Sequence, residues 1–232
     1  MFIEVNNIKL YYEKAGSGYP IILLHGNGEN HNIFDTTVNI LKEYFTVYTI
    51  DTRGHGESSN VSELHYNEMA EDIYSFIHKL KLDKPILYGF SDGGIIGLLL
   101  SIKHPNLLST LIISGVNTNP NGLQKKWLIL FKIIYKFKKT KEYKLMLEEP
   151  NITIDMLHKI TVPTYITVGS KDVIRKKHTN LIHNNIPNSK LKIFDNEDHG
   201  SYIINSDKIA KYLLEILVAK HQKRLPWGSL KY

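Results

Sequence analysis

The chain has no cysteine among its 232 residues, and that absence excludes several kinds of protein. Without thiols it can form no disulfide framework, no thiolate metal site and no cysteine nucleophile. It also lacks any apolar run near the roughly 18 residues that a membrane-spanning helix needs. In its first residues, MFIEVNNIKLYYEK, apolar and polar side chains alternate and both signs of charge occur. A signal peptide would instead begin with basic residues followed by an apolar run. We therefore expect a soluble, cytoplasmic protein.

The charge excess is small, because 29 Lys and Arg residues against 23 Asp and Glu residues give a net charge of +6. Much of it lies in residues 123–144, LQKKWLILFKIIYKFKKTKEYK, and a little more in the tail, HQKRLPWGSLKY (221–232). A basic surface can bind nucleic acid, but no helix-turn-helix, RNA-binding aromatic signature or zinc finger accompanies these lysines. We expect no nucleic-acid partner, and the tail takes no part in the functional argument. Nothing in the sequence indicates an oligomeric state.

Short apolar runs alternate with helical patterns along the chain. The runs at 2–5 and 8–13 alternate like two antiparallel strands, whereas six later runs are continuous, as in strands buried on both faces. These six are 20–26, 45–54, 84–91, 108–116, 162–172 and 189–199. Helical patterns lie at 32–44, 67–80, 94–105, 175–186 and 209–220. The alternation predicts an α/β fold with a mostly parallel, doubly wound sheet.

One segment interrupts this alternation after the sixth predicted strand. Residues 117–161 separate a core of residues 1–116 and 162–232, and we expect them to form a small helical lid over the carboxyl edge of the sheet. Trp127, Leu130, Phe131, Ile134 and Tyr135 have helical spacing, with lysines at 125, 126, 132, 136, 138 and 139 around them. We expect this helix to lay its apolar face over the pocket. A membrane surface or a protein contact stays open as an alternative, because basic amphipathic helices also bind there.

A glycine-flanked serine follows the fifth predicted strand, in the sequence Gly89-Phe90-Ser91-Asp92-Gly93. This G-x-S-x-G pattern at a strand–helix junction is typical of a nucleophile elbow, in which a sharp turn exposes the serine Oγ. Small flanking residues let the two backbones approach each other. The pattern predicts that Ser91 is a nucleophile.

A serine nucleophile needs a base, and the base needs an orienting acid. Asp172 follows the predicted strand at 162–172, and His199 follows the next strand, so both emerge at the same sheet edge as Ser91. Asp195 and Asp198 are rival acids, but they lie too close to His199 in sequence to reach its far ring nitrogen easily. We predict that Asp172 is the acid and His199 the base.

Two backbone N–H groups are needed to stabilise the oxyanion that such a serine generates. One is expected from Asp92, the residue after the nucleophile. The other is expected from the loop HGNG (25–28), through Asn27, with Gly28 as the neighbouring alternative.

Five motifs together resemble those of the α/β-hydrolase superfamily, over nearly the whole chain. They are HGNG (25–28), DTRGHGESS (51–59), GFSDGG (89–94), GSKD (169–172) and DHG (198–200). The resemblance implies an α/β-hydrolase fold, with an eight-stranded sheet whose second strand is antiparallel. It also implies a triad of Ser91, His199 and Asp172. His55 and His25 are then interpreted as residues that shape loops near the pocket rather than as rival bases.

The resemblance narrows the chemistry to acyl transfer to water. Relatives that cleave carbon–halogen bonds or epoxides carry aspartate where this chain has Ser91. We expect a carboxylesterase-like enzyme acting on a small-molecule acyl substrate, with no metal or cofactor. Thioester, lipase-like or carbon–carbon bond hydrolysis remain alternatives, as does a non-catalytic binding protein of the same fold.

Several residues are expected to line the substrate pocket. Gly28, Phe90, Trp127 and Phe131 are the predicted substrate-binding residues. Phe34 and Tyr202 are further candidates, although every one of these aromatic side chains could equally belong to the core.

Overall fold

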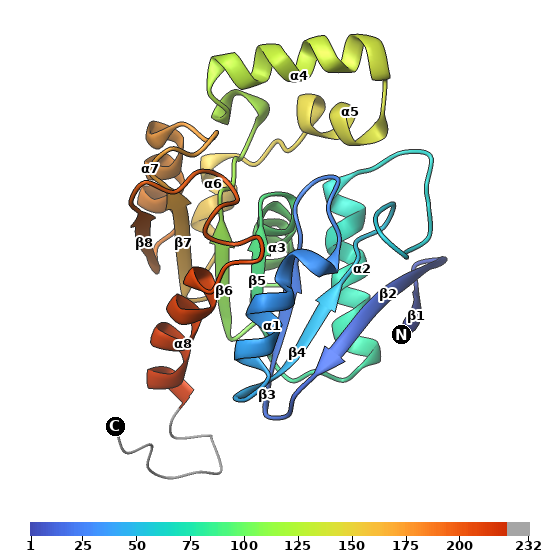
Figure 1. Ribbon diagram of the computed structural model, residues 1–232, viewed down its shortest axis with the longest axis vertical. Helices are drawn as coiled ribbons and strands as arrows, with labels where there is room; N and C mark the ends of the chain where they lie inside the picture. Colours follow the sequence, from blue (N-terminus) through green and yellow to red (C-terminus); the bar gives the residue numbers. More distant parts are fainter. Residues whose placement is uncertain (222–232) are drawn as a thin grey trace.

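The computed structural model describes residues 1–221, and its centre is an eight-stranded sheet (Figure 1). The strands lie in the order β1-β2-β4-β3-β5-β6-β7-β8. Their bounds are β1 (Phe2–Val5), β2 (Ile8–Ala15), β3 (Tyr19–Leu24), β4 (Phe45–Ile50), β5 (Ile86–Phe90), β6 (Thr110–Ser114), β7 (Thr164–Gly169) and β8 (Ser189–Phe194). β2 is antiparallel to both of its neighbours, and the six strands from β3 through β8 are all parallel to one another. This confirms the predicted sheet. The basic tail at 222–232 lies outside the described residues.

Helices cover both faces of the sheet because the strands are apolar on both faces. Along β3, Ile22 and Leu24 join the core on one side, while Ile21 and Leu23 join the core on the other. This is the two-residue alternation of a strand. α2 (Tyr66–Lys79), α3 (Asp92–Lys103) and α7 (Lys176–Asn185) pack on the first side. α1 (Asp35–Leu41), after a short η1 (His31–Phe34), and α8 (Lys208–His221) pack on the second.

The segment between β6 and β7 contains η2 (Pro120–Gly122), α4 (Lys125–Lys138), α5 (Lys141–Glu148) and α6 (Ile154–His158). α4 and α5 lie together beyond the carboxyl ends of the central strands (Figure 1). α4 ends where Lys139 takes a left-handed conformation, and the Thr140 side chain then caps α5. α6 packs instead against α3 and α7, and its Leu157 is fully buried in the core.

None of the helices within residues 1–221 is both long enough and apolar enough to span a lipid bilayer.

Candidate active site

Ser91 occupies a strained turn between β5 and α3, with φ 51° and ψ −112°. A non-glycine residue rarely adopts a positive φ, and such strain is held only where the surroundings fix it. A Cβ atom on Gly89 would lie 2.2 Å from the carbonyl oxygen of Gly93, and one on Gly93 would lie 2.2 Å from that of Leu24. Both flanking glycines are therefore required by the close approach of α3 to β3 and β5.

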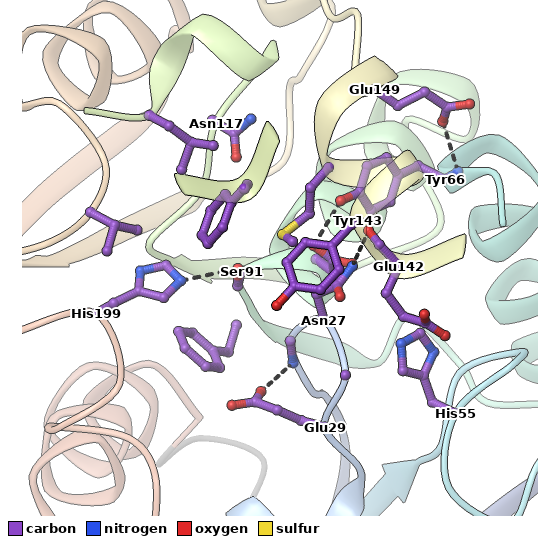
Figure 2. A pocket seen from close by; sticks show the side chains of 18 of the residues that line it. Asn27, Glu29, His55, Tyr66, Ser91, Asn117, Glu142, Tyr143, Glu149 and His199 are labelled. Atoms are coloured by element: carbon purple, nitrogen blue, oxygen red, sulfur yellow. Dashed lines mark hydrogen bonds between the residues drawn. The ribbon is translucent and has the colours of Figure 1, made fainter. Parts of the chain in front are cut away.

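His199 lies beside Ser91 at the carboxyl edge of the sheet (Figure 2), and Asp172 contacts the other ring nitrogen of His199. The His199 Nε2 atom lies 3.1 Å from the Ser91 Oγ atom, and its Nδ1 atom lies 2.8 Å from Oδ1 of Asp172. Asp172 is almost fully buried, whereas about a quarter of the His199 side chain is exposed. The rival carboxylate of Asp198 accepts instead from the backbone N–H groups of its neighbours Gly200 and Ser201.

A glycine after β6 makes room for the histidine, and the sequence argument did not single it out. Gly115 has φ 61°, and a Cβ atom there would lie 2.7 Å from Cε1 of His199. On another side, the Phe90 ring packs against the His199 ring with 4.9 Å between centroids. The imidazole is thus confined between Gly115 and Phe90.

Asn27 and Asp92 line the cavity together with Ser91. Among residues 1–221, neither of their backbone N–H groups donates to a protein acceptor. The two side chains bond to each other, because Nδ2 of Asn27 donates to Oδ2 of Asp92 at 2.8 Å. This hydrogen bond joins the loop after β3 to the turn at Ser91. It therefore limits the movement of the Asn27 and Asp92 backbone N–H groups relative to each other.

Asp92 is a buried carboxylate with a second partner, the hydroxyl of Tyr66 on α2. Tyr66 donates to Oδ1 of Asp92 at 2.7 Å. Burial raises the pKa of Asp92, while the hydrogen bonds from Tyr66 and Asn27 act to lower it. Nδ2 of Asn27 also donates to the backbone oxygen of Glu142 at 3.3 Å. The network therefore joins the turn at Ser91, the loop after β3, helix α2 and helix α5.

His25 and His55 contact backbone atoms of the loops near the site, as expected from the sequence. Nε2 of His25 accepts from the Thr52 backbone N–H at 3.1 Å, so its Nδ1 carries the proton and donates to the Gly26 oxygen at 2.7 Å. Burial lowers the pKa of His25 to about 4, so this ring stays neutral. His55 lines the cavity and its Nδ1 lies 3.1 Å from the backbone oxygen of Arg53.

Glu29 is a carboxylate of the site that the sequence argument missed. Its Oε2 accepts from the Gly26 backbone N–H at 2.8 Å (Figure 2). Burial raises the pKa of Glu29. The side chain lies close to Ser91, because a Cβ atom on Gly26 would be 2.7 Å from Oε2 of Glu29 and 3.2 Å from the Ser91 Cβ. Glu29 therefore helps to fix the loop that presents Asn27.

The cavity above Ser91 has a volume of about 670 Å³ and is open to solvent. The four predicted substrate-binding residues, Gly28, Phe90, Trp127 and Phe131, all line it. Phe34 and Tyr202 are instead fully buried in the core. The lining also includes Asn117, Leu123, Glu142, Tyr143 and Met146, which the sequence argument did not predict. Within residues 1–221 no cluster of three or more His, Asp or Glu side chains is arranged to hold a metal ion.

Comparison with known proteins gives one family and many relatives. The family described as "alpha/beta hydrolase fold" matches residues 19–145, which is more than half of the chain. The chain is 26% identical to human "Serine hydrolase BPHL", over 93% of this chain and 85% of that protein. It is 39% identical to "AB hydrolase superfamily protein YisY" of Bacillus subtilis strain 168, but over only 42% of this chain and 37% of that protein.

Solved structures give the same picture. The esterase EaEST from Exiguobacterium antarcticum superposes with a TM-score of 0.79 and 28% identity, covering 93% of this chain and 98% of that chain. An esterase from Thermogutta terrifontis superposes with a TM-score of 0.75 at 20% identity, covering 92% of this chain and 94% of that chain, and this second likeness concerns the fold alone.

Proposed function

Because the chain belongs to the α/β-hydrolase family, we propose that it hydrolyses a carboxylic ester through Ser91, His199 and Asp172. The similarity to known hydrolases identifies the chain as a hydrolase. The proposal that its substrate is an ester is based on the residues of the site. One observation carries the proposal: the Ser91 hydroxyl lies 3.1 Å from Nε2 of His199. Asn27 and Asp92, whose backbone N–H groups have no acceptor within residues 1–221, line the same cavity. A serine, a base and two donors are the groups that acyl transfer requires.

In the acylation step, Ser91 Oγ attacks the ester carbonyl carbon while its proton passes to Nε2 of His199. Asp172 accepts a hydrogen bond from Nδ1–H, which keeps the ring in the tautomer whose Nε2 can act as a base. The carbonyl oxygen becomes an oxyanion, which the N–H groups of Asn27 and Asp92 stabilise. By analogy with mutated oxyanion holes, each donor contributes about 3–4 kcal/mol to the transition state.

In the second half of the reaction, the tetrahedral intermediate collapses and the carbon–oxygen bond to the leaving group breaks. His199 gives its proton to the departing alcohol, which leaves Ser91 acylated. A water molecule then loses a proton to His199 and attacks the acyl carbon, and the return of that proton to Ser91 Oγ releases the acid. The part of His199 that is exposed gives this water a path to the acyl group.

The shape of the cavity supports small or medium acyl groups rather than a deeply enclosed chain. Aromatic side chains from the lid, Trp127, Phe131 and Tyr143, offer an apolar wall. Carboxylates of Glu29 and Glu142 lie among the same lining. The substrate is therefore expected to combine an apolar part with polar groups that donate hydrogen bonds.

The test is hydrolysis of p-nitrophenyl esters from acetate to palmitate by the wild type and by Ser91→Ala. We expect the wild type to prefer short and medium chains, and Ser91→Ala to lose about 10³-fold or more of kcat. Ser75→Ala, which changes a half-buried serine on α2 away from the cavity, is the matched control and should keep wild-type activity. Undiminished turnover by Ser91→Ala would contradict the proposed nucleophile. Absence of turnover with every ester would contradict the ester substrate and favour carbon–carbon cleavage or ligand binding without reaction.

A further inference from the structure

Helix α4 presents a row of apolar side chains to solvent. Ile129, Ile133 and Phe137, spaced four residues apart, are 58%, 51% and 79% exposed, and the adjacent Leu130 is 41% exposed. We name these four residues the outer stripe. They are four of the nine exposed large apolar residues in the part of the chain that the structure describes. Such a gathering on one helix face marks an interaction surface, whereas single exposed apolar residues are common.

The lid role of α4 does not explain the outer stripe. The helix touches the cavity through Trp127 and Phe131, on its opposite side. The expectation that Leu130 would share that inner face is wrong, since it faces solvent. A helix that only covered the cavity would need one apolar face and could be polar on the other. α4 lies at the outside of the fold (Figure 1), and no side chain between Lys125 and Lys138 is buried. The helix therefore has one apolar side on the cavity and a second one in solvent.

Charge on α4 indicates what kind of partner could cover the stripe. Six lysines, at positions 125, 126, 132, 136, 138 and 139, lie on the helix or at its end. None of the six pairs with a carboxylate of residues 1–221. No Asp or Glu occurs anywhere in residues 123–141. A second copy of this chain docked through the same face would bring unpaired lysines together, which is unfavourable.

We propose that α4 docks on an anionic phospholipid bilayer. An anionic bilayer offers apolar acyl chains for the outer stripe and phosphate groups for the lysines. The lysine stems can run along the helix while their ammonium groups reach the headgroups. The fourteen residues of α4 extend about 21 Å and would lie in the plane of the interface. The cavity would then open beside the lipid surface.

The first test is co-sedimentation of the full chain with vesicles. Vesicles contain phosphatidylcholine alone, or phosphatidylcholine with an equal part of phosphatidylglycerol. We expect binding to the anionic vesicles in 0.1 M salt, at least ten-fold weaker binding to phosphatidylcholine, and a similar loss in 0.5 M salt because charge is screened. Equal binding to both compositions, or none to either, would overturn the proposal.

Substitutions on α4 separate the contribution of the outer stripe to vesicle binding from that of the lysines. Ile133→Asn with Phe137→Asn removes part of the outer stripe and should weaken binding at least ten-fold. Lys132→Gln with Lys136→Gln should weaken binding about 25-fold, because each lysine near an anionic surface contributes a factor of roughly five. All four side chains are exposed, so the urea midpoints of both variants should match the wild type.

The matched control removes the same charge elsewhere. Lys159→Gln with Lys177→Gln changes two exposed lysines outside α4 and should leave binding within two-fold of the wild type. If this variant lost as much binding as the α4 lysine variant, general positive charge rather than α4 would be responsible.

The second test uses the lack of cysteine in the chain. Phe137→Cys gives a unique site for an environment-sensitive fluorophore, and Lys159→Cys gives a control site away from α4. The label at 137 should shift to the blue on anionic vesicles and the label at 159 should not. A wild type that elutes as a dimer, binds no vesicles, and becomes monomeric with Ile133→Asn and Phe137→Asn would show that a second copy covers the stripe instead.

Discussion

Replacing Tyr66 by phenylalanine removes one hydroxyl and leaves the Asp92 carboxylate short of a partner. The hydroxyl donates to Oδ1 of Asp92 at 2.7 Å, and both side chains are buried. A hydrogen bond to a buried charged group contributes about 1.5–3 kcal/mol. Asp92 keeps its bond from Asn27, so we expect Tyr66→Phe to lower the free energy of unfolding by about 2 kcal/mol near pH 8.

The cost of this substitution should also depend on pH. Burial raises the pKa of Asp92 above its usual 3.8, so the native carboxyl holds its proton to a higher pH than the unfolded one. Ionisation of Asp92 therefore costs stability as the pH rises through that interval. The hydrogen bond from the Tyr66 hydroxyl lowers the pKa of Asp92. Without this hydroxyl, the native pKa of Asp92 rises further above the unfolded value, and stability is lost over a wider pH range. The penalty of Tyr66→Phe should accordingly grow from pH 4.5 to pH 8.

Urea unfolding at both pH values measures this effect. With an m-value of about 2 kcal/mol/M, a loss of about 2 kcal/mol moves the midpoint by about 1 M. Tyr74→Phe on the same helix is the matched control, because its hydroxyl has no hydrogen-bond partner within residues 1–221. A loss below about 0.5 kcal/mol for Tyr66→Phe, or one that shrinks as the pH rises, would refute the reasoning.

Three further predictions concern the elbow, a loop histidine and the acid. Gly89→Ala would place a Cβ atom 2.2 Å from the Gly93 oxygen, so we expect lower stability and lost esterase activity; a normal urea midpoint with full activity would contradict this. Burial holds the pKa of His25 near 4 against 6.5 when unfolded, so its contribution to stability, on the order of 3 kcal/mol, should be lost as the pH falls from 6.5 to 4. In urea unfolding, the free energy of unfolding of His25→Gln should decrease less steeply from pH 6.5 to pH 4 than that of the wild type. Equal pH dependence of the two proteins would refute this role of His25. Asp172→Asn should lower kcat by about 10⁴-fold with KM little changed, because His199 loses its orienting acceptor; steady-state kinetics showing an unchanged kcat would be inconsistent with that role.

The sheet edge explains why so much could be predicted from the sequence. In parallel strands, all carboxyl ends meet at one edge, so residues just after predicted strands fall together without any knowledge of long-range contacts. Ser91, Asp172 and His199 are of this kind, and so is Asn27. The number of strands and the antiparallel β2 were implied by the family resemblance and agree with the structure.

Helices α4 and α5 could be predicted only in part from the sequence. Helical spacing identified α4 but did not indicate which of its sides faces the cavity, so Leu130 was placed on the wrong face. α5 is only eight residues long and was not predicted, although it supplies Glu142, Tyr143 and Met146 to the cavity. Gly115 and Glu29 were missed because their roles depend on contacts between segments far apart in the sequence.

The proposed reaction requires Ser91 as its nucleophile, and covalent labelling can identify that nucleophile. Wild type, Ser91→Ala and Asp172→Asn would each be treated with a fluorophosphonate that reacts with activated serines, and the intact mass and the labelled peptide would be determined. We expect one equivalent of label in the wild type, on the peptide that contains Ser91. Labelling should be absent in Ser91→Ala and much slower in Asp172→Asn. Stoichiometric label on another residue, or labelling of Ser91→Ala at the wild-type rate, would contradict this role of Ser91.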